Sequence, residues 1–212
     1  MMMEKSGVEN CLNVLLSNYS DIENLMLEQI FSIRKISFID RRGWCIDSYD
    51  GGEQESDKYD DDLAYYIYVV EGNKLTGCVR LRPSLCSTLL SQTFSCLRAI
   101  SSIEAVNKAW EASRFCLLRP SAPEGKPLRV RGGLDKRTLS MFIKMIEFSK
   151  IKDIDFYEVI VDQAMLKIIN FSGWEYALVN EDKIKFGAPV FYVHLHCNSN
   201  SLSNLKKKLL GD

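Results

Sequence analysis

Residues 31 to 60 read FSIRKISFIDRRGWCIDSYDGGEQESDKYD, a stretch that combines the end of a helix with a long polar loop. Arg34 and Phe38 are four residues apart in the predicted helix and therefore share one face. Gly43 is a typical residue at which a helix ends. The loop beyond it carries Trp44, Asp57 and Asp60. Loops of about twenty residues in compact domains are usually functional or disordered, and this composition favours function. The alternative is that both aromatic residues belong to the core and the acids to a solvated surface.

Length and composition indicate an ordinary globular protein. The 212 residues suit one domain, which we place at residues 1–196, followed by a flexible, basic C-terminal tail at 197–212 that is frayed or weakly helical. The formal net charge of −1 argues against a protein that coats nucleic acid. Seven cysteines without a C-x-x-C pair indicate reduced thiols in a cytoplasmic protein. We expect no signal peptide and no membrane span, because the required apolar segments are missing.

The residues on either side of the loop predict a helix and a β-hairpin. Ser20 and Glu23 have the spacing of a capping box, and apolar residues at helical intervals predict a helix from Asp21 to Arg42. Residues 64–70 and 75–81 are strand patterns joined by a turn that contains glycine. Arg80 lies on the more polar face of the second strand.

A further predicted strand, Trp110–Leu117, also contains charged residues. Strict alternation places Glu111, Ser113 and Phe115 on one face, and Ala112, Arg114 and Cys116 on the other. Unpaired charges inside a sheet are costly, so Arg80 and Glu111 need partners. A zwitterionic or cationic small molecule bound between these elements explains such charges better than surface ion pairs do.

The second half of the chain alternates between predicted helices and strands. The predicted elements are a helix at 138–150, a strand at 156–161, a helix that follows Asp162 and ends near Gly173, and strands at 174–179 and 189–196. Because the first strands form a hairpin, the sheet should be mixed rather than all parallel. The expected fold class is therefore α/β, with helices on both faces of a central mixed sheet.

Several enzyme classes lack their motifs in this sequence. There is no phosphate loop, no G-x-G-x-x-G dinucleotide fingerprint and no G-x-S-x-G nucleophile elbow. The only histidines, His194 and His196, alternate on one predicted strand without further ligands at a characteristic spacing. We therefore expect no metal site, and we expect the scattered cysteines to be structural rather than nucleophilic.

The order of motifs resembles that of the acyl-homoserine-lactone synthases, which make bacterial quorum-sensing signals. The resemblance rests on R-K-x-x-F-x-D-R-x-G-W, E-S-D-x-Y-D, G-C-V-R-L and W-E-x-S-R-F between Phe31 and Phe115, and more weakly on Val159–Trp174. It implies an acetyltransferase-like, three-layer αβα sandwich around a mostly antiparallel twisted sheet. It also implies the joining of S-adenosylmethionine to an acyl chain held on acyl carrier protein. Methylthioadenosine is released, and no cofactor is needed because S-adenosylmethionine is a substrate.

Carried over position by position, the resemblance assigns roles to residues of this chain. We expect catalytic roles for Glu111, Arg80 and Arg114, substrate binding by Arg34, Phe38, Trp44, Asp57, Asp60, Phe94 and Ser113, and an acyl-chain pocket that includes Val159 and Val161. The sulfonium of S-adenosylmethionine suits carboxylates and aromatic faces. Glu111 is the candidate base for the substrate amine. The alternative for Glu111 is a structural ion pair with Arg34, Arg80 or Arg114.

Two features of the acyl donor follow as hypotheses. Basic residues in and around the 138–150 helix predict docking of an acidic carrier protein on Arg131, Lys136, Arg137, Lys144, Lys150 and Lys152. Because Val159 stands where some family members carry a threonine, we expect a preference for chains that are unsubstituted at the 3-position. The rival functions are an acetyltransferase-like enzyme that uses acyl coenzyme A and a non-catalytic module that binds S-adenosylmethionine.

Overall fold

The computed structural model describes residues 12–98, 103–119, 129–130, 133–183 and 188–211. Its centre is a seven-stranded sheet with the order β1-β2-β3-β4-β5-β7-β6. The strands are β1 (Leu12–Asn18), β2 (Tyr65–Glu71), β3 (Lys74–Pro83), β4 (Ala109–Leu117), β5 (Phe156–Asp162), β6 (Tyr176–Asp182) and β7 (Val190–His196). Only β4 and β5 pair in parallel, and all other neighbours are antiparallel. The predicted mixed sheet is confirmed.

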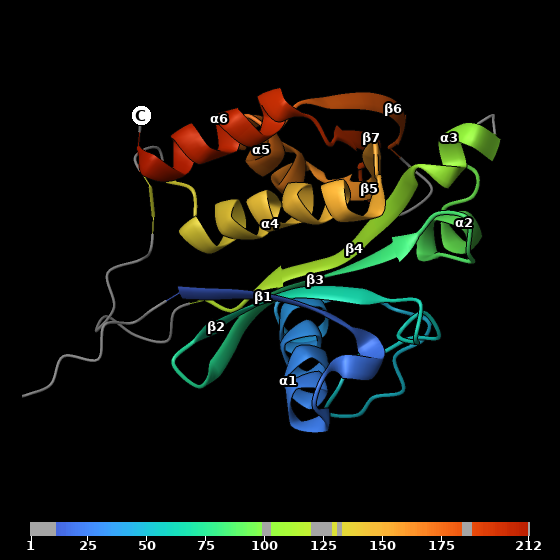
Figure 1. Cartoon of the computed structure of the whole chain (residues 1–212). Helices are drawn as coiled ribbons and strands as arrows, with labels where there is room; N and C mark the ends of the chain where they lie inside the picture. Colours follow the sequence, from blue (N-terminus) through green and yellow to red (C-terminus); the bar gives the residue numbers. More distant parts are fainter. Residues whose placement is uncertain (1–11, 99–102, 120–128, 131–132, 184–187, 212) are drawn as a thin grey trace, which may run out of the picture.

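Helices cover both faces of this sheet. The helices are α1 (Asn24–Lys35), α2 (Leu89–Thr93), α3 (Ile103–Asn107), α4 (Lys136–Lys152), α5 (Gln163–Ser172) and α6 (Ser199–Leu210). Figure 1 shows α4, α5 and α6 on one side of the sheet and α1 on the other. The main apolar core lies under α4, where Phe142 and Ile146 pack with sheet residues such as Ile67 and Tyr157. The three-layer arrangement is thus built from two opposed apolar faces.

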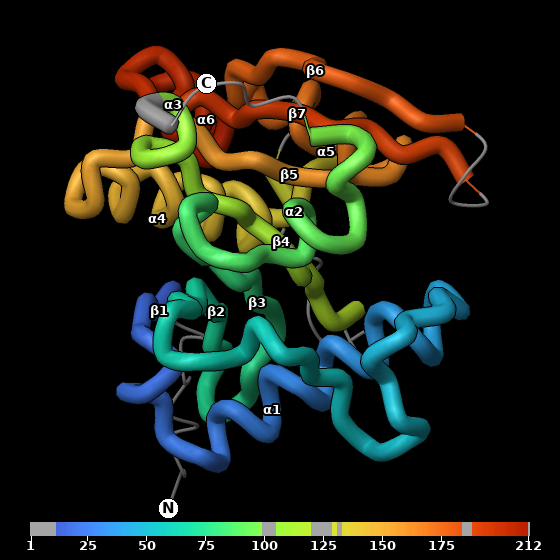
Figure 2. Tube along the Cα trace, turned by 90° about the vertical axis from the view of Figure 1, so that its right-hand side faces the viewer, coloured from blue at the N-terminus to red at the C-terminus, as the bar shows by residue number. Residues whose placement is uncertain are grey.

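The parallel pair in the middle of the sheet is short. β4 and β5 are paired only from Ala109, opposite Phe156, to Glu111, opposite Glu158. The strands continue beyond these residues without pairing to each other. Figure 2 shows β1 to β3 with α1 in the lower half of the molecule, β5 to β7 in the upper half, and α2 between them. The break places Glu111 where the two halves of the sheet meet.

A β-bulge in β4 changes which side chains face α1. Cys78 pairs with Cys116 and Arg80 pairs with Ser113, so β4 has one residue more than β3 across this interval. Arg114 lies within it with a φ of 57°, a left-handed conformation that is uncommon outside glycine. Consequently Ser113 and Arg114 both reach the same charged cluster, and Phe115 packs instead against the main core. The predicted strict alternation in this strand was wrong.

The N-terminal elements also differ from the prediction. β1 was not predicted, although its residues pair along the whole length of β2. The N-cap of α1 is Glu23, whose side chain makes no capping hydrogen bond, so the predicted capping box with Ser20 was wrong. The helix is α-helical only to Lys35 and continues as a π-helical turn, Ile36–Asp40. Turns of this type are frequent at functional sites, and this one contains Phe38.

The predicted flexible tail is a folded helix. α6 is capped by Asn198, whose side chain accepts a hydrogen bond from the Ser201 amide. Leu205 is fully buried in the main core, and Leu202 and Leu209 pack against it. These three leucines recur at helical spacing, which explains why the segment packs on α4 despite its serines and lysines.

Other predicted elements are confirmed. α4 contains the predicted 138–150 segment, and Asp162 and Gly173 cap α5 as expected. Among the described residues, no helix is long and apolar enough to cross a membrane.

Candidate active site

Three arginines from three elements converge beneath the 41–64 loop. Arg34 comes from α1, Arg80 from β3 and Arg114 from the bulge of β4. The side chains of Arg34 and Arg80 are completely buried, and that of Arg114 is 9% exposed. Such charges are tolerated inside a protein only when each has partners.

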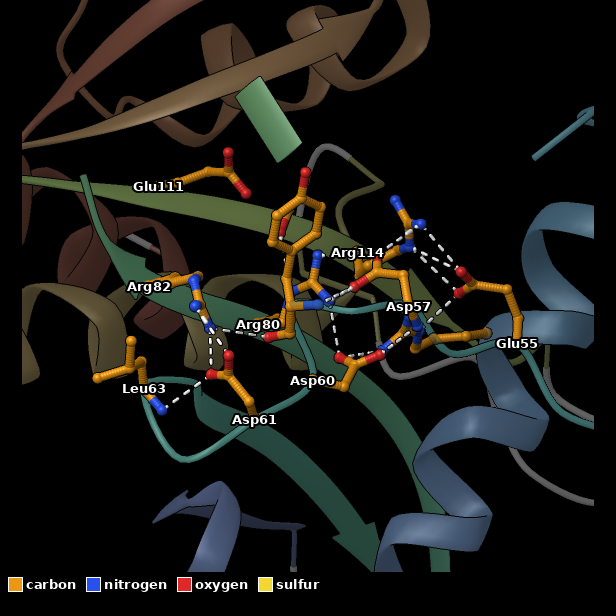
Figure 3. Close-up of polar contacts among 12 residues, drawn as sticks. Glu55, Asp57, Asp60, Asp61, Leu63, Arg80, Arg82, Glu111 and Arg114 are labelled. Carbon is orange, nitrogen blue, oxygen red and sulfur yellow. Dashed lines mark hydrogen bonds and ion pairs between the residues drawn. The ribbon is translucent and has the colours of Figure 1, made fainter. Parts of the chain in front are cut away.

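The partners are three carboxylates of the loop. Glu55 accepts from Arg34 Nε at 2.7 Å and from Arg114 Nη2 at 2.9 Å. Asp57 is 2.5 Å from Arg80 Nη1 and 2.9 Å from Arg114 Nη2. Figure 3 shows the carboxylates of Glu55 and Asp57 turned toward Arg114. Each of these acids therefore joins two arginines.

Asp60 completes this group. One of its oxygens accepts from Arg34 Nη1 at 2.8 Å and from Arg80 Nη1 at 2.7 Å, and also from the Tyr66 hydroxyl. Its other oxygen accepts from the Asp57 amide at 2.8 Å. We call the six charged residues the loop cluster: Arg34, Glu55, Asp57, Asp60, Arg80 and Arg114. Their formal charges sum to zero.

The loop cluster keeps its acids ionised. Burial by itself raises the pKa of Asp60, but the charges of Arg34 and Arg80 hold the pKa far below its ordinary value. The same opposition of burial and neighbouring guanidiniums leaves the pKa values of Glu55 and Asp57 lowered. The predicted acids at 57 and 60 are therefore brought together with all three predicted arginines. Their oxygens are occupied by guanidinium groups rather than turned freely to a ligand.

An aromatic pair borders the cluster. The rings of Phe38 and Trp44 are stacked, with centroids 5.2 Å apart and planes within 9° of parallel. Phe38 is buried, whereas Trp44 is 43% exposed. The Arg114 guanidinium lies 5.9 Å from the Phe38 ring centre, and that of Arg42 lies 4.8 Å from the Trp44 ring centre. The expected aromatic surface thus exists, in contact with the loop cluster.

Glu111 lies apart from that cluster. Figure 3 shows it without a dashed contact to Arg80, Arg82 or Arg114. Its Oε2 accepts from the Leu90 amide at 2.6 Å, and its Oε1 is buried without a hydrogen-bond partner among the described residues. In the described part of the chain no ion pair joins it to any of the three arginines, so the alternative reading of Glu111 was wrong. A buried carboxylate oxygen without a partner is costly, and it is free to accept a proton.

Comparison with known proteins shows to which family this chain belongs. The family model described as autoinducer synthase matches residues 18–205. The chain belongs to the autoinducer synthase family. Acyl-homoserine-lactone synthases are similar in sequence: that of Yersinia enterocolitica is 24% identical over 193 residues, covering 91% of this chain and 86% of its own. That of Rhizobium radiobacter is 30% identical over 162 residues, covering 75% and 73%. The expected enzyme class, an acyltransferase, is confirmed.

The fold of this autoinducer synthase is also similar to those of solved structures. The acyl-homoserine-lactone synthase LasI is 22% identical with a TM-score of 0.76, covering 94% of this chain and 96% of its own. The synthase BjaI, described as coenzyme-A-dependent and bound to S-adenosylmethionine and isopentyl coenzyme A, is 20% identical with a TM-score of 0.77, covering 94% and 90%. At these identities the likeness shows the fold, and the expected acetyltransferase-like sandwich is confirmed.

The remaining predicted residues of this synthase lie at different distances from the loop cluster. Ser113 accepts from Arg80 Nε at 3.3 Å and so joins the cluster. Phe94 packs instead with Leu90 and Tyr192 near α2. Val159 and Val161 are buried in the main core. Of the expected basic docking residues, Arg131 lies outside the described residues, and Arg137 is buried and paired with Asp135 and Glu71.

The sequence reasoning missed three partners in the site. Glu55 joins two arginines, and Tyr66 donates to Asp60. Arg82 donates to Asp61 and to the Tyr59 carbonyl, which ties the loop to β3. The alternation of β3 placed Arg82 on the same face as Arg80, so this signal was present in the sequence. Glu55 is the first residue of the quoted motif E-S-D-x-Y-D, but no role was assigned to it.

His194 packs and hydrogen-bonds with neighbouring aromatic residues of the sheet. The His194 ring stacks on Phe156 with centroids 4.2 Å apart, and its Nε2 is 2.7 Å from the Tyr192 hydroxyl. Within the described ranges, no group of three or more His, Cys, Asp or Glu side chains could hold a metal ion.

Proposed function

We propose that this protein makes an acyl-homoserine lactone from S-adenosylmethionine and an acyl thioester. Membership of the autoinducer synthase family carries the proposal. The stacked Phe38 and Trp44 beside a charged cluster support it, because S-adenosylmethionine combines an aromatic base with a cation and a zwitterion. The likeness to BjaI, whose structure holds S-adenosylmethionine, points the same way.

The loop cluster changes the role that we assign to its acids. The carboxylates of Asp57 and Asp60 already accept hydrogen bonds from Arg80. We therefore assign them to holding the arginine side chains in place rather than to attracting the sulfonium. Fixed guanidiniums suit a carboxylate such as that of the methionine moiety. The exposed Trp44 face suits the adenosyl group and the sulfonium. In this arrangement the cluster orients the substrate.

The proposed chemistry has two steps. In the first, Glu111 Oε1 takes a proton from the ammonium, and the resulting amine attacks the thioester carbonyl. The carbon–sulfur bond of the thioester then breaks, and the thiolate of the carrier takes the second proton from the nitrogen and leaves as a thiol. In the second step, a carboxylate oxygen of the methionine moiety attacks the γ-carbon, and the sulfonium leaves as neutral methylthioadenosine. Orientation of the carboxylate beside that carbon supplies much of the rate of ring closure.

We propose acyl carrier protein as the acyl donor. Lys150 and Lys152 are exposed at the end of α4, and Lys136 and Lys144 on the same helix are partly exposed. Docking of an acidic carrier on these lysines predicts that activity falls as salt rises. A coenzyme A thioester is the second candidate, which the likeness to the coenzyme-A-dependent BjaI favours.

The test is a reconstituted reaction with each donor. Purified protein is incubated with S-adenosylmethionine and either an acyl carrier protein or a coenzyme A thioester of the same acyl chain. Lactone and methylthioadenosine are quantified by mass spectrometry. Equal amounts of both products from the carrier-bound chain support the proposal. Methylthioadenosine without lactone, or S-adenosylmethionine binding without any product, contradicts it, and a clear preference for coenzyme A removes the carrier protein.

A further inference from the structure

The segment 84–98, which follows β3, contacts the candidate base Glu111. It contains α2, and the backbone amide of Leu90 in that helix donates to Glu111 Oε2. The side chain of Leu90 is buried against Tyr192 of β7, together with Leu97. The direction in which Glu111 Oε1 points therefore depends on where this segment lies.

Arg98 ties the two ends of the segment to the sheet. Its Nε and Nη2 donate to the two oxygens of Glu158 at 3.0 and 2.9 Å, in a bidentate pair. The same Nη2 lies 3.2 Å from the Ser84 carbonyl oxygen, at the start of the segment. Asn180 of β6 donates to the Leu97 carbonyl at 3.2 Å. Bidentate pairs of this kind fix geometry as well as contributing energy.

Glu158 is itself held from the neighbouring strand. Its side chain is 1% exposed, and Oε1 accepts from the Tyr192 hydroxyl at 2.5 Å. That hydroxyl is in turn 2.7 Å from His194 Nε2. Because the hydroxyl proton goes to the carboxylate, the hydroxyl oxygen accepts from the imidazole. We call Arg98, Glu158, Tyr192 and His194 the β5 cluster.

The β5 cluster lies directly beside Glu111. Glu111 and Glu158 are opposite each other in the short parallel pairing of β4 and β5. Glu111 is the last residue of this pairing, so the backbone of β4 is not paired with β5 beyond it. The hydrogen bond and the charge of Glu158 raise the pKa of Arg98, and the charges of Tyr192 and Glu111 raise it further. The Arg98–Glu158 bonds of the β5 cluster link residues 84–98 to β5 next to Glu111.

We propose that Glu158 and Arg98 are positioning residues for Glu111. They hold α2 so that Leu90 engages Oε2 and leaves Oε1 open toward the substrate amine. This inference rests on the proposed function, since it takes Glu111 as the base. Loss of either partner releases the segment, and the carboxylate of Glu111 loses its fixed direction. A misplacement of about 1 Å in such a group can lower a rate about a hundredfold.

Kinetics of five variants, with Glu111→Gln included as the background of the double variant, test the inference. Glu158→Gln is expected to lower kcat for lactone formation about 10- to 100-fold with little change in KM for S-adenosylmethionine. Arg98→Lys is expected to do the same, because an ammonium cannot form the bidentate pair. In a Glu111→Gln background, Glu158→Gln is expected to cause no further loss, since both act through one group. The matched control is Tyr157→Phe. Tyr157 is next to Glu158 in β5 but faces the other side of the sheet, and the substitution removes its buried hydrogen bond to the Met145 carbonyl. It is expected to leave kcat unchanged per folded molecule.

A measurement that needs no activity separates this inference from the proposed function. In nitrogen-15-labelled protein, the short bond to Glu111 is expected to place the Leu90 amide proton strongly downfield. Glu158→Gln and Arg98→Lys are expected to move this signal toward its position in Glu111→Gln, whereas Tyr157→Phe leaves it in place. A Leu90 signal that ignores Glu158→Gln, or rate losses that simply add in the double variant, overturns the positioning role. A wild-type protein that forms no lactone contradicts the proposed function instead, whatever the Leu90 signal shows.

Discussion

The loop cluster is buried and the β5 cluster is partly buried, and the two differ in how their charges are matched. The loop cluster matches three arginines with three carboxylates. Each carboxylate contacts two arginines, and that of Asp60 also accepts from the Tyr66 hydroxyl. In the β5 cluster, Arg98 forms an ion pair with Glu158. The neighbouring Glu111 has one oxygen without a hydrogen-bond partner among the described residues. The loop cluster holds a fixed shape, although Arg34 Nη2 is buried without a hydrogen-bond partner among the described residues, whereas the Glu111 oxygen without a partner is an acceptor and can take up a proton. We therefore propose support and orientation for the first cluster and acid–base chemistry for the residues around the second.

The largest expected effect is on the stability of the loop cluster. Asp60→Asn leaves three buried arginines with two acids, so we expect the free energy of unfolding to fall by about 3–5 kcal/mol. Urea denaturation measures it. Asp61→Asn is the matched control in the same loop, because Asp61 also pairs with an arginine but its side chain is 42% exposed. Its partner Arg82 is 4% exposed but also donates to the Ser87 and Tyr59 carbonyls, so the loss should be smaller than for Asp60→Asn.

From the sequence, the position of these acids in a polar loop predicts that Asp57→Asn and Asp60→Asn leave the fold intact. The structure indicates otherwise for Asp60, because its side chain is only 3% exposed. If Asp60→Asn and Asp61→Asn cost the same small amount, the loop cluster does not support the fold.

Acid should weaken the loop cluster next. The pKa values of Glu55, Asp57 and Asp60 are lowered in the folded protein. Their stabilisation is therefore fully present above the unfolded-state pKa values, 3.8 for aspartate and 4.5 for glutamate, and is lost as pH falls toward the folded-state values. We expect these groups to leave the unfolding free energy unchanged between neutral pH and pH 4.5 and to lower it below that. Urea titrations at a series of pH values should show a shallower decline for Asp60→Asn, and an identical decline for both proteins contradicts the assignment.

A moderate effect is expected on substrate use. Asp57 joins Arg80 and Arg114, so Asp57→Asn frees two guanidiniums from a shared anchor. We expect KM for S-adenosylmethionine to rise about tenfold, the equivalent of one hydrogen bond to a charged group. Initial rates at varied S-adenosylmethionine measure this, and turnover is normalised to the folded fraction. An unchanged KM in folded protein removes the orienting role of the loop cluster.

The smallest effect concerns the acyl chain. Val159 is buried in the main core and has no hydroxyl to offer a 3-oxo group. A buried oxygen without a partner costs about 1–3 kcal/mol, so we expect unsubstituted chains to be preferred. Val159→Thr should raise the share of 3-oxo product about tenfold when matched donors of equal length compete. A wild-type product pool dominated by the 3-oxo lactone contradicts the prediction.

Local patterns predicted much of the fold because they act over a few residues. The hairpin of β2 and β3, the apolar stripe of α4 and the caps of α5 all lie within short segments. The leucines of α6 carried the same signal, but the serines and lysines between them suggested a tail. β1 was missed because its pairing with β2 joins residues about 50 positions apart.

The sequence predicted which residues belong to the site better than it predicted which of them contact each other. The motif residues identified the three arginines and two of their acids, and the structure brings all five together. The partner of each arginine is set by the bulge at Arg114 and by how the loop returns over β3, and neither has a local signature. For the same reason Glu111 could not be separated from the loop cluster in advance.

The most direct test of the division between the two clusters is the rate of Glu111→Gln per folded molecule. Glutamine can still accept from the Leu90 amide, so the unfolding free energy should stay close to that of the wild type. It cannot take a proton from the substrate amine, so lactone formation should fall at least about a hundredfold, and raising the pH should not restore it fully. Unchanged turnover per folded molecule together with a clear loss of stability would contradict the account, because Glu111 would then support the fold and not the chemistry.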